Sequence, residues 1–402
     1  MDVEISRPFL EMFGPNISTV EGETWRTHRR IIQQAFTEKN LQLVWTETVL
    51  VIEKLFELWD EQHGQEVRIS NAADVTKKLS LMVFSAAALG RRMSWDIGSN
   101  GVVPPGYSHS FQRALSIVSG GIIARLLTPT WAEGLTTATQ TLATGFRDYR
   151  KYLLAMEDSY RKQGRLDQEL IGSEDSAFTT TENLFMNILV TASEEKSEIQ
   201  EVEFEQKEVT GNAFLLLFAG HETTAYALAF SLGLLAAHPD IQAQVYAQLK
   251  RVLGSRRKLE YTDMGELKLV TGVLLEALRL YPALPQLSRN VDEDFTISTA
   301  SNAPGVDENV RESIFIPAKS KIVISVAAVH YNRMYLAVFI HTVGLDYFPA
   351  TYWPEPEDFR PARFCEAYNK DAFLGFSTGR KSCLGRRSVS DKILQNTKPT
   401  LT

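Results

Sequence analysis

A long apolar stretch, residues 209–237, most strongly constrains how this chain folds. Its pattern predicts one helix with apolar side chains on nearly every face. Such a helix belongs in a protein core, because water solvates none of its sides well. Its middle nevertheless holds a polar segment, residues 219–224, with the sequence AGHETT. Glycine and buried polar groups weaken a core helix, so this segment indicates either a kink with back-bonded hydroxyls or a ligand site.

Within that segment, Ala219 and Thr223 are four residues apart and therefore share one face of the helix. A small residue at the first position leaves room for a ligand. A hydroxyl at the second position can donate a proton to that ligand.

A short loop near the other end of the chain, residues 376–386 (FSTGRKSCLGR), holds Cys383 between Gly379 and Gly385. Metals bind thiolate rather than thiol, and the neighbouring cations favour the thiolate. Glycines allow a tight backbone path and a close approach to a flat ligand. One cysteine suits a metal whose other ligands come with its cofactor, as in haem. By itself, the loop is equally compatible with a surface turn around an inert cysteine.

A charged pair, Glu276 and Arg279, lies in the otherwise apolar stretch 271–281. Residues three apart on a helix commonly form an ordinary surface pair. The apolar neighbours here predict partial burial, which requires further polar partners. Arg363, in the sequence FRPARF at 359–364, is the candidate partner.

Taken in this order, these segments resemble the cytochrome P450 family of haem-thiolate monooxygenases, from Trp25 to Arg387. The resemblance implies a mainly α fold, triangular and with small β-sheets, formed as a single domain of residues 1–402. It implies haem b as the cofactor, and a fold that is incomplete at both ends.

The resemblance also assigns roles to individual residues. Lys381 stands where the family usually has arginine, so the charge is kept but the planar fork is lost. Trp25 and Arg29 are four residues apart, and would reach a haem propionate; a basic helix start over a solvated face is the alternative. The implied set is Cys383 as iron ligand; Ala219, Gly220, Glu222 and Thr223 as the oxygen-activation bend; Glu276, Arg279 and Arg363 as a structural triad; and Trp25, Arg29, Arg289, Phe376, Gly379, Lys381 and Gly385 as cofactor-binding residues.

The implied reaction inserts one oxygen atom from O2 into a small apolar organic substrate, with electrons from an NADPH-cytochrome P450 reductase. The AGHETT and FSTGRKSCLGRR segments look most like fungal members, of secondary metabolism or xenobiotic oxidation. Two alternatives stay open: a haem-thiolate isomerase or dehydratase, and a truncated, non-catalytic product. The pair Glu222 and Thr223 argues against the isomerase, because that pair serves dioxygen activation.

Three departures from the family pattern shape our expectations. The opening residues lack an apolar run long enough to span a bilayer. Full-length relatives sit on the cytosolic face of the endoplasmic reticulum, whereas this chain is expected to be soluble or peripheral. Nineteen residues follow Cys383, fewer than the family's final helix and sheet need. Residues 334–351 are interpreted as an anomalous insert from a gene-model error, which would otherwise form a protruding loop.

Composition is consistent with an enzyme of this size. The 402 residues are 44% hydrophobic and 23% charged, which indicates a globular chain. The net charge of −7, without a basic stripe, argues against nucleic acid as a partner. Two cysteines, Cys365 and Cys383, exclude a disulfide scaffold.

Local patterns predict further elements. Asn71 or Asp74 is the expected N-cap of one helix. Helices are expected at 41–62, 71–89, 111–127 and 142–164, and strands at 295–297 and 321–329.

Overall fold

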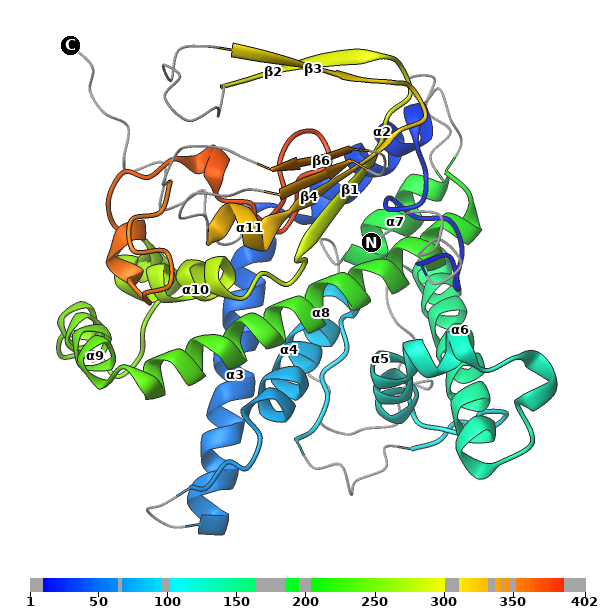
Figure 1. The fold of residues 1–402 in the computed structure, drawn as a ribbon. Coiled ribbons are helices and arrows are strands. Elements are labelled where there is room, and N and C mark those ends of the chain that lie inside the picture. The colour runs from blue at the N-terminus through cyan, green and yellow to red at the C-terminus, as the bar shows by residue number, and fades with distance from the viewer. Residues whose placement is uncertain are drawn as a thin grey trace. The chain divides into compact units, whose positions relative to one another are not determined.

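The structure is a computed structural model, and Figure 1 shows its helices and strands. The chain forms two compact units. The described residues up to 225 form the N-terminal unit, and the described residues from 226 to 386 form the C-terminal unit. Helix α8 (Gln206–Ala237) continues from the first unit into the second. The structure describes residues 10–63, 67–95, 102–163, 185–194, 204–300, 311–331, 337–340, 343–346 and 352–386.

The described part of the N-terminal unit is helical. The expected helix at 41–62 is confirmed, and the helix expected at 142–164 begins several residues earlier, at Thr137. The side chain of Asn71, not Asp74, caps the helix expected at 71–89 by accepting a hydrogen bond from Ala73 N. The described elements are α2 (Gly22–Ile32), η1 (Gln33–Ala35), α3 (Glu38–His63), α4 (Ala72–Leu89), α5 (Phe111–Leu127), η2 (Thr130–Ala132), α6 (Thr137–Gln163), α7 (Phe185–Glu194) and the first part of α8.

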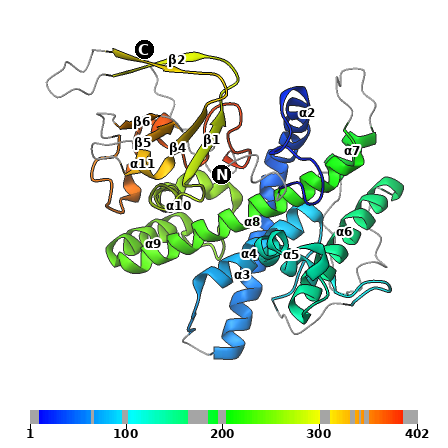
Figure 2. The ribbon, with the colours of Figure 1, turned by 45° about the vertical axis from the view of Figure 1, so that its right-hand side comes forward.

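Helices α5 and α6 lie side by side in the N-terminal unit (Figures 1 and 2). Two glycines make this close approach possible. A Cβ on Gly121 would lie 2.5 Å from Leu142 Cδ1, and one on Gly145 would lie 2.5 Å from Ile117 Cγ2. The helix pair therefore has little room for larger side chains at these positions.

The N-terminal half of α8 is held against the segment that precedes α2. A Cβ on Gly211 would lie 2.3 Å from Pro15 O, so the two backbones are in direct contact. Asn212 Oδ1 accepts a hydrogen bond from Ile17 N, and Thr210 Oγ1 donates one to Phe13 O. These contacts fix the start of α2 relative to α8.

The described part of the C-terminal unit combines short helices with two antiparallel sheets. The larger sheet has the strand order β1-β4-β5-β6, and β2 pairs with β3 as a separate hairpin. Its elements are the rest of α8, α9 (Pro239–Leu253), η5 (Tyr261–Glu266), α10 (Lys268–Leu280), β1 (Gln286–Asn290), β2 (Phe295–Ala300), β3 (Arg311–Ile316), β4 (Lys321–Ser325), α11 (Val326–His330), β5 (Ala337–Ile340), β6 (Val343–Asp346), η6 (Pro361–Phe364) and η7 (Lys370–Ala372).

Two sequence expectations were wrong in this unit. The strand expected at 321–329 ends at Ser325, whose hydroxyl accepts a hydrogen bond from Ala328 N and caps α11. The described part of 334–351 does not protrude as a loop. Strand β5 pairs with β4 in the register Ile322 to Ile340, and β6 completes a hairpin with β5. The interpretation of this segment as an anomalous insert stays a prediction, and the residues after 386 lie outside the described residues.

Of the described helices, α8 alone has the length and hydropathy that a bilayer-crossing helix requires. Its residues Ala213, Phe214 and Leu217 are buried within the N-terminal unit. This N-terminal part of α8 is therefore the core helix that the sequence predicts, whereas Phe230 and Leu232 nearer its C-terminal end are exposed.

Candidate functional site

The loop around Cys383 is closed by its own backbone. Cys383 N donates to Phe376 O over 3.0 Å, and Ser382 N donates to Gly379 O over 3.1 Å. Ser377 N donates to Leu374 O over 2.9 Å at the start of the loop. The thiol of Cys383 is exposed rather than buried as an inert side chain.

Two residues of this loop adopt left-handed backbone conformations. Gly379 has φ = 72°, which a residue with a side chain rarely adopts, and Ser377 has φ = 59°. Gly385 lies next to the thiol: a Cβ there would be 3.6 Å from Cys383 Sγ, an ordinary contact. The backbone geometry therefore requires glycine at position 379 more than at 385.

Aromatic and cationic residues surround the loop. The ring of Phe376 packs edge-to-face on Phe373, with centroids 6.0 Å apart. Arg289, on strand β1, donates to Ser377 Oγ over 3.4 Å, so the structure brings this predicted residue to the loop. Lys381 is exposed within the loop itself. One thiol flanked by cations is the donor set expected for a metal cofactor that carries acidic groups.

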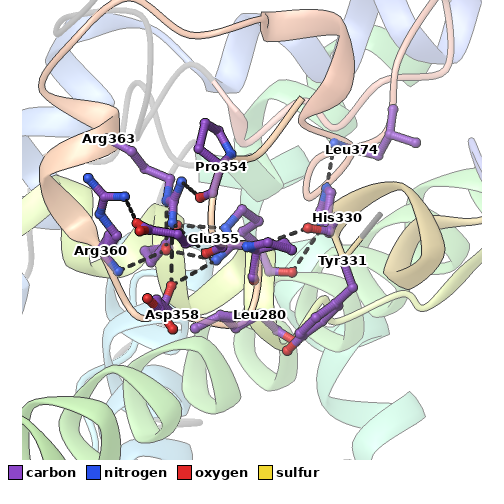
Figure 3. A network of polar contacts seen from close by, with 12 residues as sticks. Leu280, His330, Tyr331, Pro354, Glu355, Asp358, Arg360, Arg363 and Leu374 are labelled. Carbon is purple, nitrogen blue, oxygen red and sulfur yellow. Dashed lines mark hydrogen bonds and ion pairs between the residues drawn. The ribbon is translucent and has the colours of Figure 1, made fainter. Parts of the chain in front are cut away.

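Glu276 binds both Arg279 and Arg363. Figure 3 shows Arg363 in this network, beside Pro354 and Glu355. Arg279 Nε and Nη2 each donate to the carboxylate of Glu276 over 2.8 Å. Arg363 Nε donates to Glu276 Oε1 over 2.9 Å, and Arg360 N donates to the same oxygen over 3.0 Å. The side chains of Glu276 and Arg279 are completely buried, so the pair depends on this full set of partners.

Both arginines extend the network into the segment that precedes the loop. Arg279 Nη1 donates to His330 O and Pro356 O, and its guanidinium lies 5.5 Å from the ring of Trp353. Arg363 donates to Pro354 O over 2.9 Å. Burial lowers the pKa of the Arg363 guanidinium from its ordinary value. The network therefore ties helix α10 to the irregular chain that leads towards Cys383.

His330, the last residue of α11, was not among the residues predicted from the sequence. It is completely buried, and its ring stacks on Phe373 with an interplanar angle of 9°. Its two ring nitrogens contact Arg279 O and Leu374 N. The one hint in the sequence is that His330 follows an apolar run that resembles a strand. Its contacts could not be predicted from this, because its partners are distant in the sequence.

The polar segment of α8 shows the back-bonded hydroxyls that the sequence allowed. Thr223 Oγ1 donates to Ala219 O, and Thr224 Oγ1 donates to Gly220 O, each over 2.7 Å. Ala219, Gly220 and Thr223 are exposed within the N-terminal unit, whereas Glu222 is half-buried. Small and hydroxyl side chains thus present an accessible face in the middle of an otherwise apolar helix.

Helix α4 supports this segment from behind. Ser80 Oγ donates to His221 O over 2.9 Å, and a Cβ on Gly220 would lie 3.3 Å from the ring of Phe84. His221 is buried, and burial lowers its pKa, which favours the neutral ring. Neither Ser80 nor Phe84 was singled out from the sequence.

Trp25 and Arg29 lie together on α2, with the guanidinium 5.7 Å from the ring centroid. The helix is held to α8 by His28, which was not predicted as a site residue and is buried rather than part of a solvated face. Its Nε2 lies 3.2 Å from Glu208 Oε1, and its Nδ1 lies 3.1 Å from Asn212 Nδ2. Burial raises the pKa of the Glu208 carboxyl, but the contact with His28 and a backbone N–H outweigh it, and the pKa is lowered.

The site residues predicted from the sequence thus form separate groups of neighbouring residues within each unit. In the C-terminal unit, Arg289 contacts the Cys383 loop, and Glu276 binds both other triad residues, Arg279 and Arg363. In the N-terminal unit, Trp25 and Arg29 form one pair, and residues 219–223 share one stretch of α8.

In the part of the chain that the structure describes, no three or more His, Cys, Asp or Glu side chains are placed to hold a metal ion together, so Cys383 belongs to no such group. A metal that brings most of its ligands within a cofactor needs only one such thiolate from the protein. A haem iron is such a metal, and the loop glycine, exposed thiol and adjacent cations fit that cofactor.

Comparisons with known proteins identify the family. Residues 9–387 match the family profile described as Cytochrome P450. This chain belongs to the cytochrome P450 family. Proteins of this family bind haem b, so the cofactor prediction is confirmed at the level of the family.

The relatives include fungal proteins. "Cytochrome P450 monooxygenase 124" from Postia placenta is 35% identical over 381 residues, which are 94% of this chain and 66% of that protein. "Cytochrome P450 monooxygenase ORF6" from Penicillium roqueforti is 27% identical over 417 residues, which are 96% of this chain and 66% of that protein. The P450 chain described here spans about two thirds of the length of these curated relatives.

Solved structures confirm the predicted fold. The crystal structure of the cytochrome P450DA haem domain has a TM-score of 0.67 at 19% identity, and covers 98% of this chain and 75% of that one. A zebrafish cytochrome P450 crystallised with abiraterone has a TM-score of 0.64 at 18% identity, with 97% and 76% coverage. At this level of identity, the likeness concerns the fold alone.

Proposed function

We propose that this P450, as part of a protein of its relatives' full length, is a haem-thiolate monooxygenase with Cys383 as the iron ligand. One observation carries the proposal, namely the surroundings of Cys383. This exposed cysteine lies in a closed loop in which Ser377 and Gly379 have left-handed backbone conformations. The buried network of Glu276, Arg279 and Arg363 supports the chain that precedes the loop. A rigid support of this kind is what a ligating thiolate requires. The names of the fungal relatives support the same reaction class.

The haem supplies the redox chemistry and the activation of dioxygen when it is bound. The residues of this chain hold and orient it. Cys383 provides the thiolate, Gly379 permits the loop path, and Arg289 and Lys381 provide positive charge for the acidic groups of the cofactor. Trp25 and Arg29 on α2 are proposed as a further propionate contact, because arginine binds carboxylates through two parallel hydrogen bonds.

Proton delivery is proposed for the exposed face of α8. Thr223 Oγ1 donates to Ala219 O, so its hydrogen is engaged with the helix and its oxygen can accept a hydrogen bond. Rotation of the Thr223 side chain would turn the donor towards the exposed face. Glu222, half-buried beside it, would replenish the proton.

The proposed electron donor is an NADPH-cytochrome P450 reductase, and the proposed substrate is a small apolar organic molecule of secondary metabolism. For the full-length protein, we propose the cytosolic face of the endoplasmic reticulum membrane. The support for these assignments is the reaction class and the fungal origin of the relatives. The chain is proposed to act as a single domain.

The test is reductase-dependent oxidation of a panel of aromatic and terpenoid hydrocarbons by the haem-loaded chain. Thr223→Ala should lower product formed per NADPH by about tenfold or more and raise hydrogen peroxide release. Thr224→Ala is the matched control, because this hydroxyl makes the same 2.7 Å bond to the preceding turn. Equal effects of both variants would contradict the assigned role of Thr223. Turnover that needs no reductase would favour an isomerase or dehydratase.

A further inference from the structure

The C-terminal end of α10 is closed by two side chains from α11 and the residue after it. The last carbonyls of a helix have no partners within that helix. His330 Nδ1 lies 2.9 Å from Arg279 O, and Tyr331 OH donates to Leu280 O over 2.7 Å (Figure 3). Arg279 Nη1 in turn donates to His330 O over 3.0 Å, so the two residues are bonded reciprocally.

The second ring nitrogen of His330 faces a different part of the chain. Leu374 N donates to His330 Nε2 over 2.9 Å. Because Arg279 O can only accept, Nδ1 carries the hydrogen, and Nε2 is left with the lone pair that Leu374 N requires. One neutral tautomer therefore satisfies both contacts. Burial lowers the pKa of His330 to about 4, which keeps this tautomer neutral at ordinary pH.

The backbone hydrogen bonds of the Cys383 loop begin at Leu374. Its carbonyl accepts a hydrogen bond from Ser377 N, and Phe376 O accepts one from Cys383 N. Phe373, next to it, stacks on the His330 ring at a centroid distance of 5.5 Å. The chain of contacts thus runs from the buried Glu276–Arg279 pair through one imidazole to the base of the loop.

We propose that His330 is a positioning residue that fixes the start of the Cys383 loop to the C-terminal end of α10, and thereby sets the direction of the thiol. This inference rests on the proposed haem-thiolate function for its consequence at the iron. Its structural content concerns the Leu374 amide alone and is testable without haem.

Three variants of the full chain separate the two contacts. His330→Asn keeps a donor near Nδ1 for Arg279 O but cannot reach Leu374 N. His330→Gln places an oxygen near the former Nε2 and retains an acceptor for Leu374 N. Tyr331→Phe is the matched control, because it removes one hydrogen bond to the end of α10 without touching the loop.

The first measurement is hydrogen exchange of the Leu374 amide in the haem-free chain. His330→Asn should raise its exchange rate by about fivefold or more, the factor expected from one lost hydrogen bond. His330→Gln and Tyr331→Phe should leave the rate near that of the parent. Equal exchange in His330→Asn and the parent would overturn the proposed tether.

The second measurement is the carbon-monoxide difference spectrum of the haem-loaded proteins. The red-shifted band of the thiolate complex should shrink in His330→Asn and be largely retained in His330→Gln and Tyr331→Phe. A loss in Tyr331→Phe as large as in His330→Asn would mean that His330 acts only through general stability. If the parent itself lacks the band, the proposed function fails, while the exchange experiment still decides on the tether.

Discussion

Removal of the Glu276 carboxylate is the perturbation whose cost the structure defines most clearly. Its two oxygens accept from Arg279 Nε, Arg279 Nη2, Arg363 Nε and Arg360 N, at distances between 2.8 and 3.0 Å. Glu276→Ala would leave the guanidinium of Arg279, which is completely buried, without its counter-charge. Breaking a buried ion pair on one side costs about 3–5 kcal/mol of the free energy of unfolding.

A loss of this size is a large part of the roughly 5–15 kcal/mol by which domains are stable. The appropriate assay is equilibrium urea unfolding of the haem-free chain, followed by circular dichroism and tryptophan fluorescence. Trp353 lies against Arg279, so fluorescence includes a signal from the network itself. Because the chain forms two units, the two signals need separate analysis.

The control is a charged pair of similar spacing in solvent. Asp158 and Lys162 are four residues apart on α6, with side chains 60% and 67% exposed. Asp158→Ala should cost about 0.5 kcal/mol or less, because solvent screens exposed pairs. A cost below about 1 kcal/mol for Glu276→Ala, or one equal to that of Asp158→Ala, would refute the reasoning.

Three further predictions concern stability. Gly272→Ala should destabilise the chain although alanine favours helix, because the new Cβ would lie 2.5 Å from Pro361 O. Gly233→Ala should stabilise the chain, because no atom lies within 4 Å of the new Cβ, and thermal melting compares the two variants. The pKa of His330 is lowered from 6.5 to about 4 in the folded chain, so on acidification the unfolded chain binds this proton at a higher pH than the folded chain does. The free energy of unfolding should therefore fall by up to about 3 kcal/mol as pH falls from 6.5 to 4. Urea titrations should show that His330→Gln lacks this component, and an unchanged pH slope would contradict it. Asn71→Ala should cost about 1 kcal/mol in the same assay through the lost helix cap, and no loss would contradict that role.

The helices and the network partners were accessible from the sequence because local chemistry determines them. Apolar periodicity located α3 and α4, and the expected N-cap of α4, Asn71 or Asp74, is Asn71 in the structure. The expected partnership of Arg363 with Glu276 followed from the cost of burying an unbalanced charge on an apolar helix. Each of these arguments needs only a few neighbouring residues or one strong energetic requirement.

The remainder depended on partners that are distant in the sequence. The β-branched run after Lys321 indicated a longer strand, but the hydroxyl of Ser325 favours a helix start instead. His330 finds Arg279 and Leu374 at separations of 51 and 44 residues, so no local pattern reveals its two contacts. Strand β5 likewise forms because β4 offers an edge, which the sequence of the segment alone does not show.

The central claim, that Cys383 donates the thiolate to a haem iron, is tested most directly by carbon-monoxide difference spectroscopy of the haem-loaded chain. The parent should give the red-shifted band of a thiolate complex, and Cys383→Ser should abolish it. Cys365→Ser is the matched control, since this second cysteine is half-buried and burial raises its pKa. We predict that this control keeps the band; a band that survives Cys383→Ser, or is lost in Cys365→Ser, would contradict the account.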